Sequence, residues 1–310
     1  THTHTHTHTQ RTHTYTHTHT HTHTQTHTAR PGVGGGIQIN GGAAILSRLG
    51  LQEEILAASN PLERVVSRNV DGTPLLDMHI PDLIRGLSAK PPLLRLIDVA
   101  AAARQELVAG DDSVLVFLIM RDKLQELLTA ALPAGCVKFN KKLAAVSESA
   151  DRCGVVCQFD DGETETFDLV VGCDGVKSKV RSEVVGPETA IYSGVRILFG
   201  IAPHSASGSR PQEIQREVHQ WFGEGAYAFT ASYGGAAGPM VDQIAIITAD
   251  SSKAPENPEW GVSDRRAEML GLLDEAKMPA ELRCVAVLSP CFLVFCAHRL
   301  PESVLRFFVL

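Results

Sequence analysis

The sequence lacks any apolar run long enough to cross a bilayer. The run from Val114 to Met120 is unbroken, whereas a membrane-spanning helix needs about 20 mainly apolar residues. The N-terminus also lacks the apolar core of a secretory signal peptide. We therefore expect neither a transmembrane segment nor a signal peptide.

Cysteine pairs with the spacing of metal or redox motifs are also absent. None of the 7 cysteines forms a C-x-x-C pair, and most lie in apolar, strand-like stretches. An odd number of cysteines argues against a disulfide framework. The pattern predicts buried free thiols in a reducing compartment, and no metal site.

The chain has no excess of positive charge. It carries 28 basic and 35 acidic residues, for a net charge of −7. The first 28 residues contribute only Arg11, so the remainder has 27 basic and 35 acidic residues, or −8. Nucleic-acid-binding domains usually carry a basic surface, and we therefore expect no nucleic-acid partner.

The first 28 residues are almost pure Thr-His alternation and hold ten of the 14 histidines. In an extended chain the imidazoles would line one side, which raises the hypothesis of a metal-binding stripe. A translated dinucleotide repeat is the alternative, and it is favoured because the tract offers almost no apolar area to bury. We predict that residues 1–28 are disordered.

A Gly-x-Gly-x-x-Gly fingerprint for a dinucleotide is absent too. The stretch from Pro31 to Leu51 is glycine-rich, but its spacing differs and no strand precedes it. Gly36 to Asn40 is a candidate strand, followed by a helix that ends near Leu49-Gly50-Leu51.

The most informative feature present is the segment from Asp168 to Arg181. Leu169 to Val171 has the branching of a buried parallel strand, Asp174-Gly175 predicts a tight turn, and Lys177 can start a helix. Such a turn places backbone N–H groups and a positive helix dipole at the edge of a sheet. Asp174 could then accept hydrogen bonds from ribose or ribityl hydroxyls. Arg181, about two turns into the helix, could reach a phosphate.

The alternative is an ordinary strand–turn–helix, because Asp-Gly is common in turns. The chain has two other such pairs, Asp71-Gly72 and Asp161-Gly162, which lie between alternating segments and predict hairpins. Asp174-Gly175 differs because an apolar run precedes it and a helical segment follows.

This segment resembles the DG motif of the flavoprotein aromatic hydroxylases, the group A FAD monooxygenases with the para-hydroxybenzoate hydroxylase fold. In that family the motif touches the flavin and is implicated in pyridine-nucleotide binding. The resemblance implies a cofactor-binding role for Asp174, Gly175, Ser178 and Arg181.

Two further segments are similar to the same family. Gly36 to Asn40 and Leu49 to Leu51 resemble its GIQL-like strand and the following helix, which implies a role for Gly36. Arg121 opens a predicted helix from Arg121 to Leu132 with one apolar face, and it matches a family arginine that contacts the cofactor. The alternative is a solvated arginine, although the first turn of a helix disfavours a cation without an anionic partner.

The chain also departs from the family. It has no G-x-G-x-x-G unit and no Gly-Asp-Ala-Ala-His-like motif after the last strand segments. The resemblance therefore covers about Gly34 to Arg299 and indicates a fragment of the family's catalytic module.

The expected fold class is α/β, a partial FAD/NAD(P)-binding three-layer domain with an antiparallel β-sheet substrate domain. We expect a low-complexity tract at 1–28, a partial FAD-binding domain at 29–190 whose hairpin 62–80 joins the substrate sheet, the substrate domain at 191–284, and a return to the FAD-binding domain at 285–310. Five aromatic residues could line an apolar pocket, although core packing is favoured for each: Trp221, Phe222, Tyr227, Phe229 and Tyr233.

The resemblance implies an FAD-dependent monooxygenase. NAD(P)H would reduce the flavin, dioxygen would react with it, and one oxygen atom would pass to an apolar or aromatic small molecule by hydroxylation or epoxidation. The flavin performs this chemistry, so we name no catalytic residue, and the four histidines after the tract stand isolated in sequence. Three alternatives remain: an inactive truncated relative, another FAD enzyme such as a halogenase or reductase, and a non-enzymatic interaction module.

Overall fold

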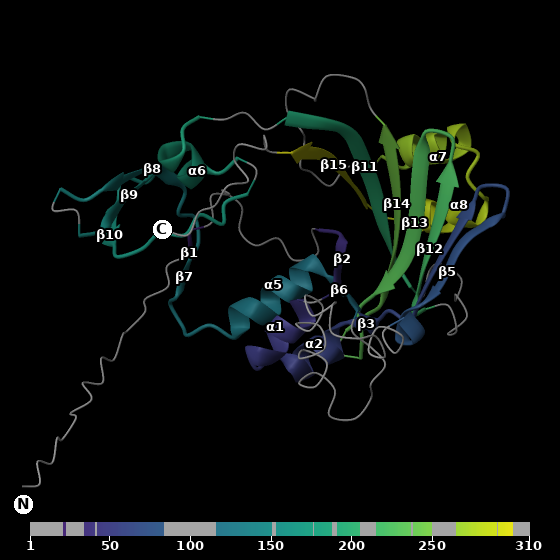
Figure 1. The fold of residues 1–310 in the computed structure, drawn as a ribbon, viewed down its shortest axis with the longest axis horizontal. Helices are drawn as coiled ribbons and strands as arrows, with labels where there is room; N and C mark the ends of the chain where they lie inside the picture. Colours follow the sequence, from purple (N-terminus) through teal and green to yellow (C-terminus); the bar gives the residue numbers. More distant parts are fainter. Residues whose placement is uncertain are drawn as a thin grey trace, which may run out of the picture.

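The computed structural model describes residues 21–22, 34–40, 42–83, 116–150, 153–175, 177–187, 191–204, 215–236, 238–249, 265–289 and 291–299. A large sheet with two helices forms one end of the molecule, a smaller sheet with three helices lies beside it, and a third sheet with one short helix forms the other end (Figure 1). Within the described residues, no helix is both long and apolar enough to span a membrane.

The large sheet has seven strands in the order β15-β11-β14-β13-β12-β4-β5. Neighbouring strands are antiparallel, except that β12 and β4 are parallel. The strands are β4 (Arg64–Asn69), β5 (Pro74–His79), β11 (Ile191–Pro203), β12 (Glu217–Gly223), β13 (Ala226–Tyr233), β14 (Val241–Ala249) and β15 (Cys291–Arg299).

Two helices, α7 (Arg266–Glu275) and α8 (Glu281–Leu288), cover one face of this sheet. Their side chains Met269, Leu273 and Leu282 pack in one core with Leu198 of β11 and Trp221 of β12. Side chains alternate between the two faces of a strand, so this contact identifies the side chains that face the helices. We call the opposite face the open face.

A three-stranded sheet, ordered β2-β6-β3, lies beside the large sheet. Its strands are β2 (Gly36–Ile39), β3 (Asn60–Pro61) and β6 (Phe117–Met120), and its helices are α1 (Gly42–Arg48), α2 (Gln52–Ala58) and α5 (Arg121–Ala130). The apolar stripe predicted from Arg121 to Leu132 is confirmed, because Leu124 and Leu127 of α5 pack against the core of this part.

The third sheet is antiparallel, ordered β10-β9-β8, and packs against α6 (Lys179–Val184). Its strands are β8 (Leu143–Glu148), β9 (Val155–Phe159) and β10 (Thr164–Phe167). Both hairpin turns predicted from Asp-Gly pairs are confirmed. Gly72 joins β4 to β5 with φ of 88° and Gly162 joins β9 to β10 with φ of 86°, a region that favours glycine.

Only two residues of the Thr-His tract lie within the described residues, so the disorder predicted for residues 1–28 stays a prediction. His21–Thr22 form a short strand, β1, which pairs in parallel with β7 (Val137–Lys138). Ladder pairing uses the backbone, so it needs no apolar side chain. The rest of the tract lies outside the described residues.

The buried parallel strand predicted at Leu169 to Val171 is wrong. This segment is irregular, and Leu169 and Val171 are 58% and 70% exposed. Only Val170 packs inward, against the core beneath α6. A parallel strand needs a neighbour for its ladder, and within the described residues none pairs with this segment.

The prediction of buried thiols holds for one cysteine side chain. Among the five described cysteines, Cys157 is buried and Cys136 is half-buried, while Cys153, Cys173 and Cys284 are exposed. The α/β class with an antiparallel sheet is confirmed. The C-terminal residues 300–310 lie outside the described residues.

Candidate functional site

The open face of the large sheet carries aromatic and uncharged polar side chains. Alternation and register place Tyr227, Phe229 and Tyr233 of β13 there, with Phe199 of β11 and Gln243 of β14. Trp221 points the other way, into the helix-covered core, and is 2% exposed. For Trp221 the favoured interpretation, core packing, is therefore confirmed, because its strand position has the opposite parity.

The glycine-rich strand β2 meets the open face at one end. The backbone N–H of Gly36 donates to Gln243 Oε1 at 2.6 Å. A Cβ on Gly36 would lie 2.1 Å from Cε1 of Tyr233, and a Cβ on Gly35 would lie 3.0 Å from Cε2 of Phe199. These contacts explain why glycine is needed at residue 36: the strand lies directly on an aromatic ring.

Arg121 lies beside the same glycine strand. Its backbone N–H donates to the Gly35 carbonyl at 3.2 Å, and a Cβ on Gly34 would lie 2.8 Å from its Nε. The structure thus brings together two of the six residues selected from the sequence, Gly36 and Arg121, at the junction between the two sheets.

The other four selected residues form a separate cluster at the start of α6. Asp174 Oδ1 accepts a hydrogen bond from the Ser178 hydroxyl at 2.5 Å. Its Oδ2 accepts from the backbone N–H groups of Lys179 at 2.6 Å and Val180 at 3.2 Å. Ser178 in turn accepts from the N–H of Arg181 at 3.0 Å. The carboxylate therefore caps its own helix, which is the arrangement that helix N-termini favour.

Arg181 also contacts this turn instead of extending away from it. It is the third residue of α6, in the first turn and not two turns along as expected, and its Nη1 donates to the Gly175 carbonyl at 3.3 Å. Gly175 has φ of 77°, as a tight turn requires. In Figure 1, α6 lies with β8 to β10, apart from β2 and α5.

The pKa of Asp174 is lowered. Partial burial acts against the charged form, but hydrogen bonds from Ser178 and from the backbone of Val180 and Lys179 outweigh it. Burial raises the pKa of the Tyr233 phenol. Burial also raises the pKa of Tyr227, and a hydrogen bond from Gln220 partly offsets that shift. Both phenols are therefore protonated donors at neutral pH.

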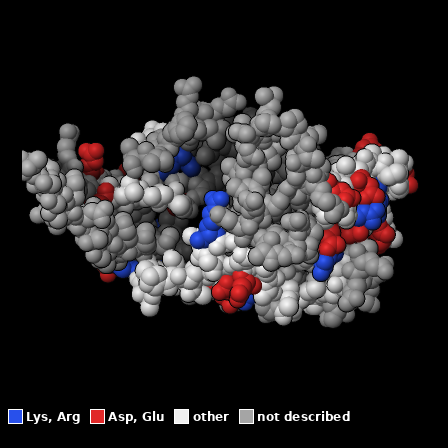
Figure 2. Space-filling model, turned by 60° about the horizontal axis from the view of Figure 1, so that its bottom comes forward, with Lys and Arg blue, Asp and Glu red and all other residues white. Residues whose placement is uncertain are grey.

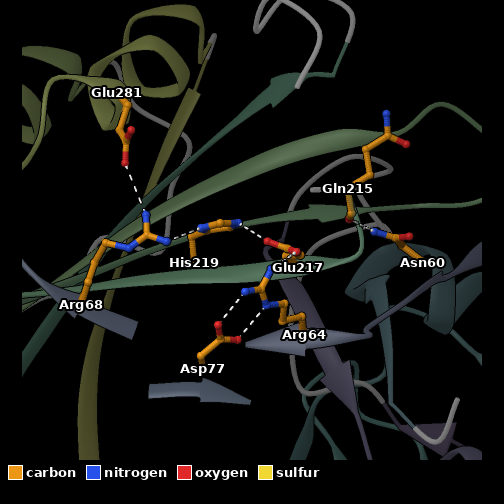
Figure 3. A network of polar contacts seen from close by, with 8 residues as sticks. All are labelled: Asn60, Arg64, Arg68, Asp77, Gln215, Glu217, His219 and Glu281. Atoms are coloured by element: carbon orange, nitrogen blue, oxygen red, sulfur yellow. Dashed lines mark hydrogen bonds and ion pairs between the residues drawn. The ribbon is translucent and has the colours of Figure 1, made fainter. Parts of the chain in front are cut away.

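A network of charged side chains lies on the helix-covered face (Figure 3). Arg64 donates to Asp77 at 2.7 and 2.6 Å, and its Nη1 lies 3.3 Å from Glu217. Arg68 lies 3.3 Å from Nδ1 of His219 and places its guanidinium over the Trp221 ring, 5.4 Å from the centroid. The members compensate each other's charge and tie β4, β5 and β12 together, which indicates a structural role.

Three of the four histidines that stand isolated in sequence lie beside a carboxylate. His204 Nδ1 lies 3.0 Å from an oxygen of the fully buried Asp242, which also accepts from Ser232 at 2.6 Å. His79 and His219 lie 3.0 and 2.8 Å from Asp82 and Glu217. Among the described residues, no group of three or more His, Cys, Asp or Glu could hold a metal ion.

Sequence reasoning missed Gln243 and Phe199. A signal for Gln243 was present, because Asp242-Gln243 interrupts an otherwise apolar strand, and an uncharged polar residue there needs a partner. Phe199 gave no signal that separates it from ordinary core phenylalanines.

No protein-family model matches the chain, but curated proteins do. It is 38% identical over 97 residues to 6-hydroxynicotinate 3-monooxygenase of Bordetella bronchiseptica, covering 31% of this chain and 25% of that protein. It is 29% identical over 197 residues to 3-amino-4-hydroxybenzoate 2-monooxygenase of Streptomyces cremeus, covering 63% of this chain and 43% of that protein. The chain therefore spans less than half the length of these curated relatives.

Solved structures share the fold. Klebsiella pneumoniae HpxO, solved with FAD and uric acid, superposes with a TM-score of 0.62 at 15% identity, over 87% of this chain and 60% of that one. A salicylate hydroxylase–substrate complex gives 0.59 at 18% identity, over 87% and 61%. The homologues of this chain are FAD-dependent aromatic monooxygenases, so the resemblance seen in the sequence is confirmed.

Proposed function

We propose that this chain carries the substrate sheet and part of the FAD site of an NAD(P)H-driven, FAD-dependent monooxygenase that acts on an apolar or aromatic small molecule. The observation that carries the proposal is the junction where β2 and Arg121 meet an aromatic, uncharged sheet face. A cation and a glycine strand suit an anionic cofactor, and the aromatic face suits an apolar ring.

The residues at the junction fit FAD in their chemistry. Arg121 begins α5 next to Gly34 and Gly35, so its guanidinium could pair with a phosphate near backbone that has no side chains. Figure 2 shows Lys or Arg side chains near the middle of the face that it draws. Gly36 and Arg121 are the residues that would hold the cofactor here.

The cluster at α6 has a second role in the proposal. Asp174, Gly175, Ser178 and Arg181 form a rigid turn whose exposed side could contact the flavin or NAD(P)H. The helix cap limits this role, because the N–H groups of Lys179 and Val180 already donate to Asp174 and are not available to a cofactor. A carboxylate oxygen has two acceptor sites, so Asp174 can still accept from a hydroxyl.

Bound FAD would take a hydride from NAD(P)H and deliver one oxygen atom of dioxygen to the substrate. The protein residues would orient and enclose the reactants. Tyr233 and Phe199 would shield the junction from water, and Gln243 would hold β2 against the sheet through Gly36.

The proposal is tested with the full chain and FAD in large excess. We expect small aromatic compounds to stimulate NADH or NADPH oxidation and to give a product one oxygen atom heavier by mass spectrometry. Arg121→Met should weaken FAD binding about tenfold or more through loss of a charge-assisted contact. Arg283→Met is the matched control, an exposed arginine of α8 that pairs with Asp274.

The other outcomes identify the alternatives. Nucleotide oxidation without an oxygenated product would favour a reductase, and a chlorinated or brominated product in halide buffer would favour a halogenase. Binding of FAD without turnover would favour an inactive relative. Equal FAD affinities of the two arginine variants would remove Arg121 from the site.

A further inference from the structure

A row of three aromatic rings crosses the open face away from the glycine strand. Phe222 of β12 and Tyr227 of β13 are paired across the strands with ring centroids 4.9 Å apart, and Phe229 lies 6.0 Å beyond Tyr227. Phe222 is 42% exposed, and Tyr227 and Phe229 are half-buried. The row therefore offers aromatic surface that the fold does not fully cover.

Two polar side chains orient the phenol in this row. The Ser67 hydroxyl, buried at 3% exposure, donates to Gln220 Oε1 at 2.6 Å. Gln220 also hydrogen-bonds the Tyr227 phenol and lowers its pKa. Because Gln220 Oε1 already accepts from Ser67, its amide nitrogen is the group left to donate to the Tyr227 oxygen.

These contacts do not use the hydroxyl hydrogen of Tyr227. The Tyr227 oxygen already accepts from Gln220, and its O–H remains a donor. A half-buried phenol whose oxygen is fixed by an oriented amide is suited to donate to a ligand.

The absence of charged side chains around Tyr227 favours a neutral oxygen as the ligand atom that accepts its hydrogen bond. In β4, β5 and β11 to β14, no Asp, Glu, Lys or Arg falls at an open-face position. Arg64 and Arg68 lie on the opposite face, with Trp221 and Glu217. A carboxylate placed on the row would lose hydration and gain one neutral donor, which is unfavourable. A carbonyl or hydroxyl oxygen needs only that donor.

We propose that Tyr227, oriented by Gln220 and Ser67, is a specificity-determining residue that donates a hydrogen bond to a neutral oxygen acceptor on an aromatic substrate lying along Phe222 and Phe229. The inference rests on the proposed function, since it names the substrate class of that site. It adds a residue and a charge preference that the relatives' substrates do not supply.

The test uses the full chain without flavin, so that its result does not depend on turnover. Acetophenone, ethylbenzene and benzoate are titrated by ligand-observed NMR, because they share a ring size and differ in the acceptor. We expect acetophenone to bind about tenfold more tightly than ethylbenzene, which corresponds to one hydrogen bond, and more tightly than benzoate.

Variants assign the preference to Tyr227. Tyr227→Phe keeps the ring but removes the hydroxyl. This variant should bind acetophenone and ethylbenzene with about equal affinity, and its affinity for ethylbenzene should equal that of the wild type. Gln220→Leu, which removes the orienting amide, should also lower the preference. Tyr192→Phe on β11 is the control and should leave it unchanged.

Three results would overturn the inference: no saturable binding of acetophenone, a preference that survives Tyr227→Phe, or tightest binding of benzoate. A failed inference with FAD-dependent product formation would leave the proposed function standing. If acetophenone binds through Tyr227 but the protein shows no turnover, the inference stands and the proposed function fails.

Discussion

Asp174 and Asp161 each precede a glycine with positive φ, yet their carboxylates have different partners. Asp161 accepts from the N–H of Glu163 at 3.0 Å inside a hairpin and pairs with Lys141. Asp174 accepts from one hydroxyl and two backbone N–H groups at the start of a helix. The same dipeptide therefore makes a loop turn in one place and a helix cap in the other.

Asp174→Ala should destabilise the chain more than Asp161→Ala. Losing a helix cap costs about 1–2 kcal/mol, whereas the hairpin at Asp161 keeps its turn through Gly162. The measurement is the free energy of unfolding in urea for both variants. Equal losses would mean that the α6 cap contributes no more than an exposed hairpin turn.

The lowered pKa of Asp174 gives this cap a pH dependence. A carboxylate whose pKa is depressed by folding stabilises the protein above its unfolded pKa, and that contribution is lost as the pH falls through the folded pKa. The stability gap between wild type and Asp174→Asn should therefore be constant above about pH 5 and should narrow below the ordinary aspartate pKa of about 3.9. A gap that stays constant down to acid pH would show that the charge of Asp174 is not what stabilises α6.

Gly36→Ala should be strongly destabilising, because its Cβ would lie 2.1 Å from the ring of Tyr233. Forced overpacking in a buried site costs about 1–3 kcal/mol. Gly271→Ala in α7 is the control: its Cβ meets nothing within 4 Å, and alanine favours a helix by up to about 1 kcal/mol. Replacing Tyr233 with Leu should relieve part of the Gly36→Ala loss. If the stability changes of Gly36→Ala and Tyr233→Leu are additive in the double variant, contact with the Tyr233 ring is not the cause of the Gly36→Ala loss.

At the scale of elements, alternation was the most reliable signal. It located the hairpin of β4 with β5 and the hairpin of β9 with β10, and the 3.6-residue period located α5, because these elements bury one face against a core that the chain itself supplies. The same reasoning failed at Leu169 to Val171, where apolar branched residues form no strand. Residue composition can indicate a strand, but it does not show whether a neighbouring strand is present to pair with it.

The alternation of side chains along a strand determines which aromatic residues share a face of the sheet, but not which face it is. Trp221 and Phe222 are adjacent, so one of them had to face the helices and the other the open face. Sequence alone could not decide which, because both faces of the sheet carry apolar side chains. The contacts of Trp221 with α7 and α8 settle it.

Deletion of residues 1–28 should leave the midpoint of thermal unfolding unchanged. Within the described part of that tract, only His21–Thr22 are paired, and a two-residue ladder hardly offsets the entropy of ordering the chain. The control replaces the tract with a Gly-Ser sequence of equal length. A clear fall in the midpoint for both proteins would show that pairing of β1 with β7 stabilises the fold.

At the scale of the whole molecule, the predicted site separates into two groups. The resemblance selected six residues from three segments. Gly36 begins a strand, Arg121 begins a helix, and Asp174-Gly175 forms a turn before a helix, each as expected locally. Only Gly36 and Arg121 meet, because β2 and α5 are joined through β6. The sequence contains no length or spacing signal for how α6 sits relative to them.

This separation predicts weak FAD binding by the chain as given. The G-x-G-x-x-G unit that would surround a pyrophosphate with N–H groups is absent from the sequence. The helix start at α6 does not replace it, because the Asp174 carboxylate occupies the N–H groups of Lys179 and Val180 and would repel a phosphate. Arg121 remains as a cationic contact, and a single charge-assisted contact contributes about 1.5–3 kcal/mol. We expect a dissociation constant above about 10 µM, equivalent to less than about 7 kcal/mol of binding, measured by flavin fluorescence titration. The protein should lose FAD on desalting, and a stoichiometric yellow protein after desalting would contradict the prediction.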